Sequence, residues 1–222
     1  MLALGIDTAS ALVTVALHGS GEHVGVRGSV QRDAVQAHGE LLAPTIEALL
    51  AAHGAALSDL TRIVVGVGPG PFTGLRVGIV TARVMGEALG VPVAGACSLD
   101  AVAVDSAASI GQPFSVVTDA RRREVYLASY DSTGRRLAAP AVARPADLDE
   151  AVRGAPVVGE GAELYASNFA DVRPHRSYAD AWLTLLDELV TSDRVTLLDT
   201  APLYLRRPDA VANVSRKRVT PA

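Results

Sequence analysis

The chain has 222 residues, of which 49% are hydrophobic, with a formal net charge of −4 and a single cysteine, Cys97. One cysteine excludes an internal disulfide framework, and the acidic balance argues against a stand-alone nucleic-acid binder. The first residues, MLALGID, contain no basic segment followed by a long apolar run, so we expect no signal peptide and a cytoplasmic location.

Apolar alternation and turn residues predict that the first half of the chain contains both strands and helices. Three strands are expected first, at Leu2–Asp7, Leu12–His18 and His23–Val30. A helix, a buried strand and a second helix are expected next, at Glu40–His53, Ile63–Val67 and Gly74–Leu89. Thr73 is the expected N-cap of that second helix. A strand at Val91–Cys97 and a helix that begins at Ser98 complete the half.

The second half repeats this order in a shortened form. Its strands are expected at Phe114–Asp119, Val125–Asp131 and Arg135–Val142. A short helix, a strand and a turn are expected next, at Ala146–Val152, Pro156–Val158 and Gly159–Gly161. The last clear helix carries an apolar stripe of Trp182, Leu185, Leu186 and Leu189. We therefore predict two halves, 1–108 and 109–222, with the last helix as a candidate to pack back on the first half and a basic tail from about residue 213.

Two similar halves with mixed sheets covered by helices define an α/β fold. The order of elements resembles the actin/hexokinase/Hsp70-like ATPase superfamily, in which a hairpin carrying Asp-x-Gly grips phosphate in each half. Asp7 and Asp119 end the first strand of each half, but Ala9 and Arg121 stand at the two glycine positions. We therefore expect the fold to be present and its phosphate grip to be damaged. The alternative for each aspartate is a turn cap without a functional role.

The stretch VGVGPGPFTGLRVG follows a predicted strand and begins a predicted helix. It does not match a P-loop, because the required Gly and Lys spacing is absent and the only lysine is Lys217. It also fails the dinucleotide pattern, because the third glycine comes one residue late, at Gly74. The stretch is therefore not a nucleotide-binding fingerprint by either rule.

Small residues recur every four positions along the helix that follows, at Gly74, Gly78, Ala82, Gly86 and Gly90. An interior glycine costs a helix about 1 kcal/mol relative to alanine, and close approach of another backbone is the usual compensation. Two interpretations are open: the stripe packs on the protein's own sheet, or a partner's helix lies in it. Because the helix is apolar nearly all round, we favour the partner.

Five segments occur in the order found in one bacterial family: ALGIDTAS, HGELLAP, GPGPFTGLRVG, DARRREVY and PLYLRR. Together they make the chain resemble the TsaB (YeaZ) family from about Leu2 to Arg207. The resemblance implies the actin-like fold and a non-catalytic scaffold in the formation of threonylcarbamoyladenosine in tRNA. It also implies two partners, the catalytic paralogue TsaD and the ATPase TsaE.

In that family, pairing uses the first two helices, here about Glu40–His53 and Gly74–Leu89. The interface residues expected on them are Leu42, Ile46, Leu49, Gly74, Leu75, Gly78, Ile79, Ala82, Met85 and Gly86. The isolated chain is a candidate homodimer. Contact with tRNA is expected only through the complex, and no membrane is involved.

We predict no metal site and no cofactor of the chain's own. TsaD holds its metal partly through a His-x3-His pair, whereas Leu42 stands four residues after His38. The family implies ATP or ADP at a junction between subunits, with Asp7, Asp119, Arg121 and Glu124 as candidate contacts. The basic turn Arg121–Arg123 is either solvated or in contact with an anion.

Two other functions compete with a scaffold. A working ATP-dependent enzyme of the same fold needs Asp7 and Asp119 to hold Mg-ATP. A peptidase needs a metal-ligand set or a Ser–His–Asp arrangement that cannot be assembled from this sequence.

Overall fold

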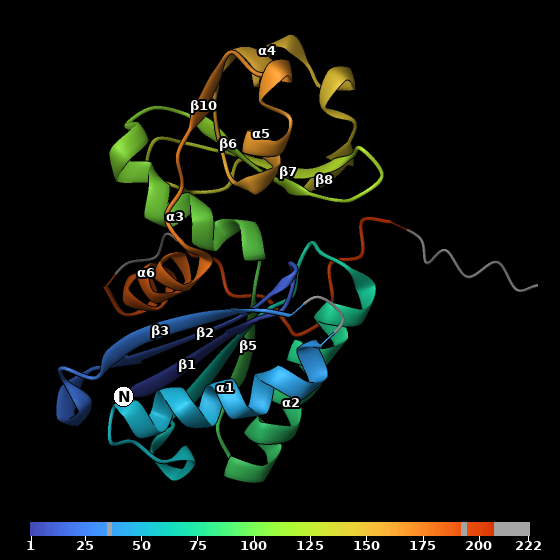
Figure 1. Cartoon of the computed structure of the whole chain (residues 1–222). Helices are drawn as coiled ribbons and strands as arrows, with labels where there is room; N and C mark the ends of the chain where they lie inside the picture. The colour runs from blue at the N-terminus through green and yellow to red at the C-terminus, as the bar shows by residue number, and fades with distance from the viewer. Residues whose placement is uncertain (35–36, 192–194, 207–222) are drawn as a thin grey trace, which may run out of the picture.

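The computed structural model of the chain describes residues 1–34, 37–191 and 195–206. Two lobes, each built on a five-stranded mixed sheet, lie one above the other in Figure 1. The predicted basic tail from about residue 213, with Arg216, Lys217 and Arg218, lies outside the described residues. Within the described parts of the chain, no helix is both long enough and apolar enough to cross a membrane.

The first sheet has the strand order β3-β2-β1-β4-β5. Its strands are β1 (Leu2–Asp7), β2 (Leu12–Gly19), β3 (Arg27–Asp33), β4 (Arg62–Gly66) and β5 (Val93–Ala96). Strands β1 to β3 pair antiparallel, with Ile6 opposite Val15, and β1, β4 and β5 pair parallel.

The second sheet has the strand order β10-β9-β6-β7-β8. Its strands are β6 (Phe114–Asp119), β7 (Val125–Tyr130), β8 (Ala141–Ala143), β9 (Pro156–Val158) and β10 (Asp171–Arg173). Strands β6 to β8 pair antiparallel, whereas β6, β9 and β10 pair parallel. Each lobe thus has the same connectivity around its first strand, and the predicted actin/hexokinase/Hsp70-like α/β fold is confirmed.

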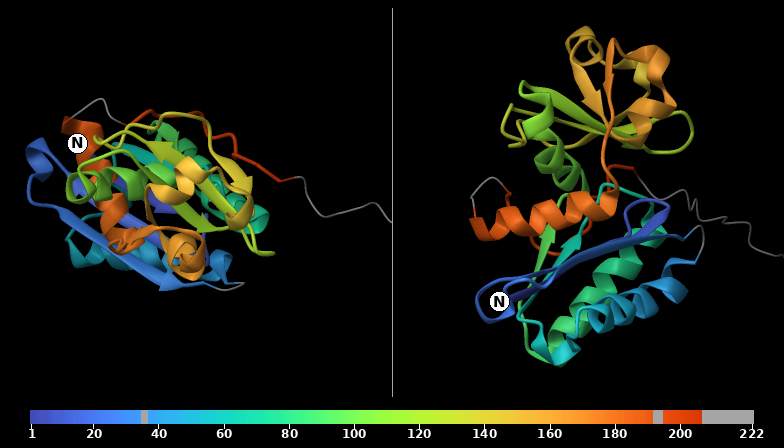
Figure 2. Two further views of the ribbon diagram at one scale, coloured as in Figure 1. Left: turned by 90° about the horizontal axis from the view of Figure 1, so that it is seen from above. Right: turned by 60° about the vertical axis from the view of Figure 1, so that its left-hand side comes forward.

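The helices cover the first sheet on both faces (Figures 1 and 2). Helices α1 (His38–Ala52) and α2 (Phe72–Leu89) pack on one face, and α3 (Ser98–Ile110) and α6 (Tyr178–Thr191) lie on the other. Helix α3 also packs against the second sheet and therefore separates the lobes. The second lobe adds α4 (Glu150–Gly154) and α5 (Glu160–Leu164). Short 3-10 turns lie at Gly21–His23, Leu57–Asp59, Pro145–Asp147 and Ala166–Asn168.

The alternation of side chains along β1 explains how α6 packs so closely. Successive strand residues face opposite sides of a sheet, and Leu2, Leu4 and Ile6 pack in the core under α1 and α2. Gly5 points the other way, and a Cβ atom there would lie 3.1 Å from Cε3 of Trp182 on α6. The absence of a side chain at Gly5 therefore makes room for the large indole.

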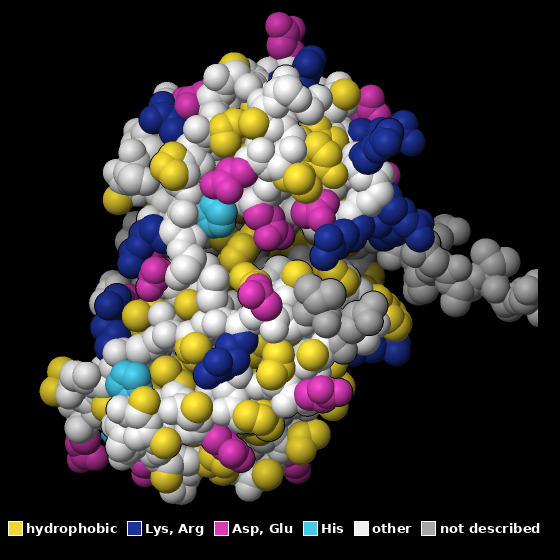
Figure 3. All heavy atoms as spheres, viewed as in Figure 1, with side chains coloured by type: hydrophobic (Ala, Val, Ile, Leu, Met, Phe, Trp, Pro, Cys, Tyr) yellow, Lys and Arg dark blue, Asp and Glu magenta, His cyan; other side chains and the backbone are white. Residues whose placement is uncertain are grey.

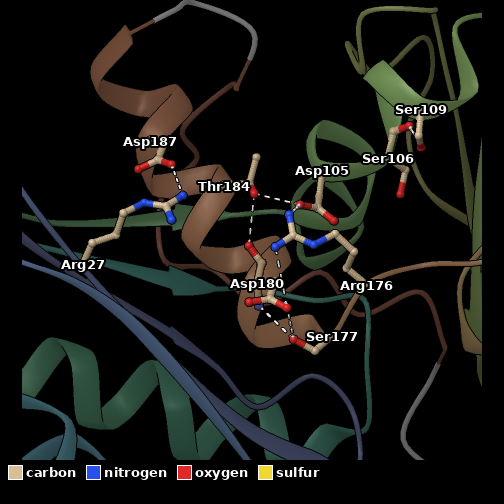
Figure 4. A network of polar contacts seen from close by, with 9 residues as sticks. All are labelled: Arg27, Asp105, Ser106, Ser109, Arg176, Ser177, Asp180, Thr184 and Asp187. Atoms are coloured by element: carbon tan, nitrogen blue, oxygen red, sulfur yellow. Dashed lines mark hydrogen bonds and ion pairs between the residues drawn. The ribbon is translucent and has the colours of Figure 1, made fainter.

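A polar network fixes α6 against α3 (Figure 4). The Asp105 carboxylate accepts hydrogen bonds from the Arg176 guanidinium at 3.0 Å and from the Thr184 hydroxyl at 2.8 Å. Ser177 caps the start of α6, since its hydroxyl accepts a hydrogen bond from the Asp180 amide at 3.1 Å. The segment that enters α6 from the second lobe is therefore bonded both to α3, through Arg176, and to the start of α6, through Ser177.

Several sequence-based boundaries are wrong. The strand predicted at His23–Val30 begins only at Arg27, because the chain turns at Gly21 and Gly25 with φ angles of 64° and 93°. The strand predicted at Arg135–Val142 is reduced to β8 and an isolated bridge at Arg136. Strand β10 was not predicted, and the expected turn at Gly159–Gly161 instead begins α5.

Candidate functional site

Thr8 joins the two most distinctive motifs of the sequence, DTAS and GPGPFTGLRVG. Its side chain is fully buried at the end of β1. The Thr8 hydroxyl donates a hydrogen bond to the Gly74 carbonyl at 2.8 Å and accepts one from the Gly78 amide at 3.1 Å. A Cβ atom on Gly78 would lie 2.4 Å from that hydroxyl oxygen. Gly74 and Gly78 therefore leave the space in which the Thr8 side chain packs against α2.

The small-residue stripe of α2 packs on the protein's own chain at Gly74, Gly78 and Gly86, whereas Gly90 is exposed with nothing within 4 Å of an added Cβ. A Cβ atom on Gly74 would lie 2.4 Å from the Thr8 carbonyl oxygen, and one on Gly86 would lie 2.1 Å from Cγ2 of Val93 in β5. Ala82, between them, is fully buried. The favoured interpretation, that a partner's helix lies in this stripe, is wrong for Gly74, Gly78 and Gly86, because Thr8 and Val93 of the same chain already occupy the space beside them.

The predicted interface residues need the same correction. Nine of the ten are buried in the chain itself: Leu42, Ile46, Leu49, Gly74, Leu75, Gly78, Ile79, Ala82 and Gly86. Met85 is only partly buried and packs against the same core. Most of the surface of these residues is taken up by the chain's own core, so their side chains offer little area to a partner in this fold. Whether α1 and α2 themselves bind a partner stays a prediction.

A different row of α2 residues faces outward. Phe72, Val80 and Val84 are 36%, 56% and 62% exposed, and with Arg76 they recur every four positions. This row is offset by two residues, about 200° around the helix, from the glycine stripe. Pro44, Ala48 and Ala51 are exposed on the neighbouring helix α1, and hydrophobic atoms are spread over this part of the lower lobe in Figure 3. We call this outward row of α2, with the exposed residues of α1, the outer face.

Asp7 is buried at the seam between the lobes, and its own chain uses both of its carboxylate oxygens. Oδ1 accepts a hydrogen bond from the Ala9 amide at 2.5 Å, and Oδ2 accepts one from the Trp182 indole at 2.9 Å. Burial raises the pKa of Asp7, and hydrogen bonds from Ala9, Ser98 and Trp182 oppose that rise. Asp7 therefore links β1 to α6, and each of its carboxylate oxygens already accepts a hydrogen bond from the chain itself.

Asp119 occupies the corresponding position in the second lobe, at the end of β6. Its carboxylate accepts a hydrogen bond from the Arg121 amide at 2.9 Å and pairs with the Arg121 guanidinium at 3.4 Å. The cavity that both aspartates line has a volume of about 20 Å³, which is space for a single water molecule. Glu160 also lines it, and burial, followed by the Asp119 charge, raises the pKa of Glu160. A magnesium nucleotide does not fit between the aspartates in this arrangement of the lobes.

The turn after Asp119 keeps a glycine-like backbone although it contains three arginines. Arg121, Arg122 and Arg123 have φ angles of 62°, 55° and 62°, a region that costs a non-glycine residue about 1–2 kcal/mol. All three are exposed, and Arg121 lines two adjoining depressions of about 270 and 430 Å³. Glu124, the other candidate anion contact, forms an ion pair with Arg206. Asp119, Arg121 and Glu124 thus share the β6–β7 hairpin, whereas Asp7 ends β1 in the other lobe, and Asp7, Asp119 and Glu124 are all bonded within the chain.

Cys97 is fully buried, and burial followed by the Asp100 charge raises the pKa of its thiol to about 12. Because the thiolate is the reactive form, we expect a disulfide reagent at pH 8 to modify the native chain more than about 100-fold more slowly than the urea-unfolded chain. A thiol pKa raised in the folded state also means that the stability contribution of Cys97 is present below about pH 8.5 and is lost as the pH rises towards 12. Equal rates in the native and unfolded chains would contradict this assignment.

Across residues 1–34, 37–191 and 195–206, no group of three His, Cys, Asp or Glu side chains lies in a position to hold a metal ion. His38 instead contacts the Ser10 carbonyl, with 3.0 Å between its Nε2 and that oxygen.

Comparison with known proteins identifies the family. The model of the TsaD family, tRNA N6-adenosine threonylcarbamoyltransferase, matches residues 12–176. An uncharacterized protein of Mycobacterium tuberculosis is 44% identical over 93% of this chain and 92% of its own length. The tRNA threonylcarbamoyladenosine biosynthesis protein TsaB of Escherichia coli is 32% identical over 59% of this chain and 55% of its own length.

A solved structure agrees over nearly the whole chain. YeaZ from Pseudomonas aeruginosa superposes with a TM-score of 0.75 at 25% identity, and the match covers 92% of this chain and 99% of that one. The two-lobed fold, the connected DTAS and GPGPFTGLRVG motifs and these matches agree with one another. The chain therefore belongs to the tRNA N6-adenosine threonylcarbamoyltransferase family, as a TsaB/YeaZ-like member.

Proposed function

We propose that the chain is a non-catalytic assembly subunit of the complex that forms threonylcarbamoyladenosine in tRNA. Its relatives in Bacillus subtilis, Haemophilus influenzae and Escherichia coli bear the name tRNA threonylcarbamoyladenosine biosynthesis protein TsaB. Its partners in this proposal are a TsaD-like paralogue and a TsaE-like ATPase in the cytoplasm, and tRNA is contacted through the complex.

The state of the two seam aspartates supports a non-catalytic role. Both oxygens of Asp7 accept hydrogen bonds from the chain itself, and the cavity that Asp7 and Asp119 line together has space for one water. An ATP-dependent enzyme of this fold needs carboxylates that are free to handle metal and water. If ATP or ADP binds at a junction between subunits, Arg121 is the contact that the chain offers, since it lines the open depressions.

The outer face is the observation on which the partner proposal depends. Val80 and Val84 are the most exposed apolar side chains of α2, at 56% and 62%. They lie four residues apart, and neighbours at that spacing share one side of a helix. A partner helix packed on this row would bury both valines together with the exposed residues of α1. The same face is the candidate for self-association when the chain is alone.

The test is the affinity of Val80→Asp and Val84→Asp variants for the TsaD-like paralogue from the same cells. A buried charge without a partner weakens an interface by about 2 kcal/mol or more, so each variant should bind about 30-fold more weakly in calorimetry. Val24→Asp is the matched control, because Val24 is 79% exposed in the connection between β2 and β3 and belongs to neither α1 nor α2. Normal binding by both α2 variants, or equal loss in the control, would refute the outer face as the interface.

Calorimetry of the isolated chain with Mg-ATP separates this proposal from the enzyme alternative. We expect no micromolar binding, because a nucleotide held by both aspartates would have to enter the cavity that they line together, and this cavity is too small for it. Micromolar binding that disappears in an Asp119→Ala variant would favour a working ATP-dependent enzyme. Asp119 is a better residue than Asp7 for this experiment, because Asp7 also accepts the hydrogen bond from Trp182 and its replacement would disturb the core.

A further inference from the structure

Residues 195–206, which we call the strap, follow α6 in sequence and run along the seam between the lobes (red in Figure 1). The strap adds to the outer edge of the first sheet: Leu198 and Gly95 of β5 form an antiparallel bridge with two N–H to O=C hydrogen bonds of 2.8 Å each. Further along, the Leu203 amide donates to the Val67 carbonyl at 2.7 Å. The strap therefore covers a sheet edge that would otherwise be open.

The strap is also held along one side of α2. The Arg83 guanidinium donates to the Thr200 hydroxyl at 2.6 Å and to the Thr200 carbonyl at 2.8 Å. Near the start of α2, the Tyr204 ring stacks on Phe72 with 4.9 Å between ring centroids. These contacts bind the strap to the first lobe at both its middle and its far end.

The last described residue reaches the second lobe. The Arg206 guanidinium donates to the Ala120 carbonyl at 3.0 Å and forms an ion pair with Glu124. Both partners belong to the β6–β7 hairpin, which also carries the arginine turn. A single extended segment is thus bonded to β5 and α2 of one lobe and to the central hairpin of the other.

Apolar packing repeats this bridging pattern. Leu198 and Leu203 are partly buried, and each packs against two cores: the one between the first sheet and α1/α2, and the one between α3 and the second sheet. Ordering an extended backbone costs about 1–2 kcal/mol per residue. If the strap were bonded at one end only, this cost would favour release of its other end. The strap is bonded along its whole length, and these contacts together hold it across the seam.

We infer that the strap is a latch that holds the two lobes closed. When it is seated, its bonds to the first lobe and the Arg206 contacts to the second fix the width of the seam that contains Asp7 and Asp119. When it is released, α3 and the crossing at Arg176 are the remaining links between the lobes within the described chain, and the seam can widen. This inference does not depend on the proposed function.

Gly95 gives the sharpest test of the latch. A Cβ atom there would lie 2.1 Å from the Asp199 carbonyl oxygen and 2.7 Å from Cγ1 of Val67, so Gly95→Ala should unseat the strap. Gly154→Ala is the matched control, because nothing lies within 4 Å of its added Cβ. Hydrogen exchange of the Leu198 and Leu203 amides should accelerate about tenfold or more in Gly95→Ala and remain unchanged in Gly154→Ala.

The lobe-to-lobe distance is measured between spin labels at Ser58→Cys and Leu137→Cys, two exposed positions on opposite lobes. Cys97 is buried and stays unlabelled. In Gly95→Ala the distance distribution should shift to longer values and broaden. Arg206→Ala, which removes only the contacts to the second lobe, should give the same shift while Leu198 stays protected. The latch is refuted if the strap exchanges rapidly in Gly95→Ala but the distance is unchanged, or if neither variant alters exchange or distance.

Discussion

A Gly78→Leu variant is expected not to accumulate as a folded protein. The added Cβ alone would lie 2.4 Å from Oγ1 of Thr8, and the rest of the leucine side chain has no space between α2 and β1. The variant also breaks the hydrogen bond from the Gly78 amide to Thr8, which leaves a buried amide without its acceptor at a cost of about 1–3 kcal/mol. Overpacking adds about 1–3 kcal/mol, so the total is a large fraction of the about 5–15 kcal/mol that stabilises a typical domain.

Urea unfolding followed by circular dichroism measures this loss, with Gly39→Leu as the control. Gly39 lies in the first turn of α1 with nothing within 4 Å of an added Cβ. The milder Gly78→Ala variant allows a double-mutant cycle with Thr8→Ala, because removal of the hydroxyl makes room for the new methyl group. We expect the two changes together to cost less than the sum of their separate effects. A Gly78→Leu variant with wild-type stability would show that the stripe does not contact β1.

Replacement of Trp182 by alanine is expected to be the most destabilising single change in α6. Trp182 is fully buried, and truncation of a buried tryptophan costs about 3–5 kcal/mol. The same change removes the donor to Oδ2 of Asp7, so a buried carboxylate oxygen loses its partner. Since Trp182 is the only tryptophan, unfolding is followed by circular dichroism and not by fluorescence.

Trp182→Phe separates the two contributions. Phenylalanine keeps most of the ring volume against Gly5 but has no N–H group, so we expect a loss of about 1–3 kcal/mol from the unpaired Asp7 oxygen. If Trp182→Phe is as stable as the wild type, the hydrogen bond to Asp7 contributes nothing and the indole acts by volume alone. If it is as unstable as Trp182→Ala, the effect comes from the carboxylate.

The strands that the sequence predicts best are rich in apolar residues and have an Asp or a Gly at or directly after their last residue. Leu2–Asp7, Phe114–Asp119 and Pro156–Val158 are found with the predicted bounds. Strand β10 has only three residues and little apolar character; it exists because β9 offers it a parallel edge. Pairing partners of this kind are tertiary information, so local periodicity does not report them.

The glycine stripe of α2 is a second case in which the sequence pattern does not report a tertiary contact. Its four-residue period correctly predicts that something approaches the helix closely, but a helix that is apolar nearly all round does not say which side is inside. The answer depends on Thr8, which lies 66 residues before Gly74 in the sequence, so that no local pattern in the helix reports the contact. The exposure of Val80 and Val84 follows from this orientation, so the outer face could not be predicted until the inner one was known.

The division of α2 into two opposite rows has a consequence for how such a protein can change over time. Substitutions at Gly74, Gly78 and Gly86 are constrained by folding, so these positions should tolerate almost no variation. Substitutions at Arg76, Val80 and Val84 leave the interior untouched and are constrained only by whatever lies against them. In another lineage the same helix can therefore bind a different protein through its outward row, while its packing on the sheet stays unchanged.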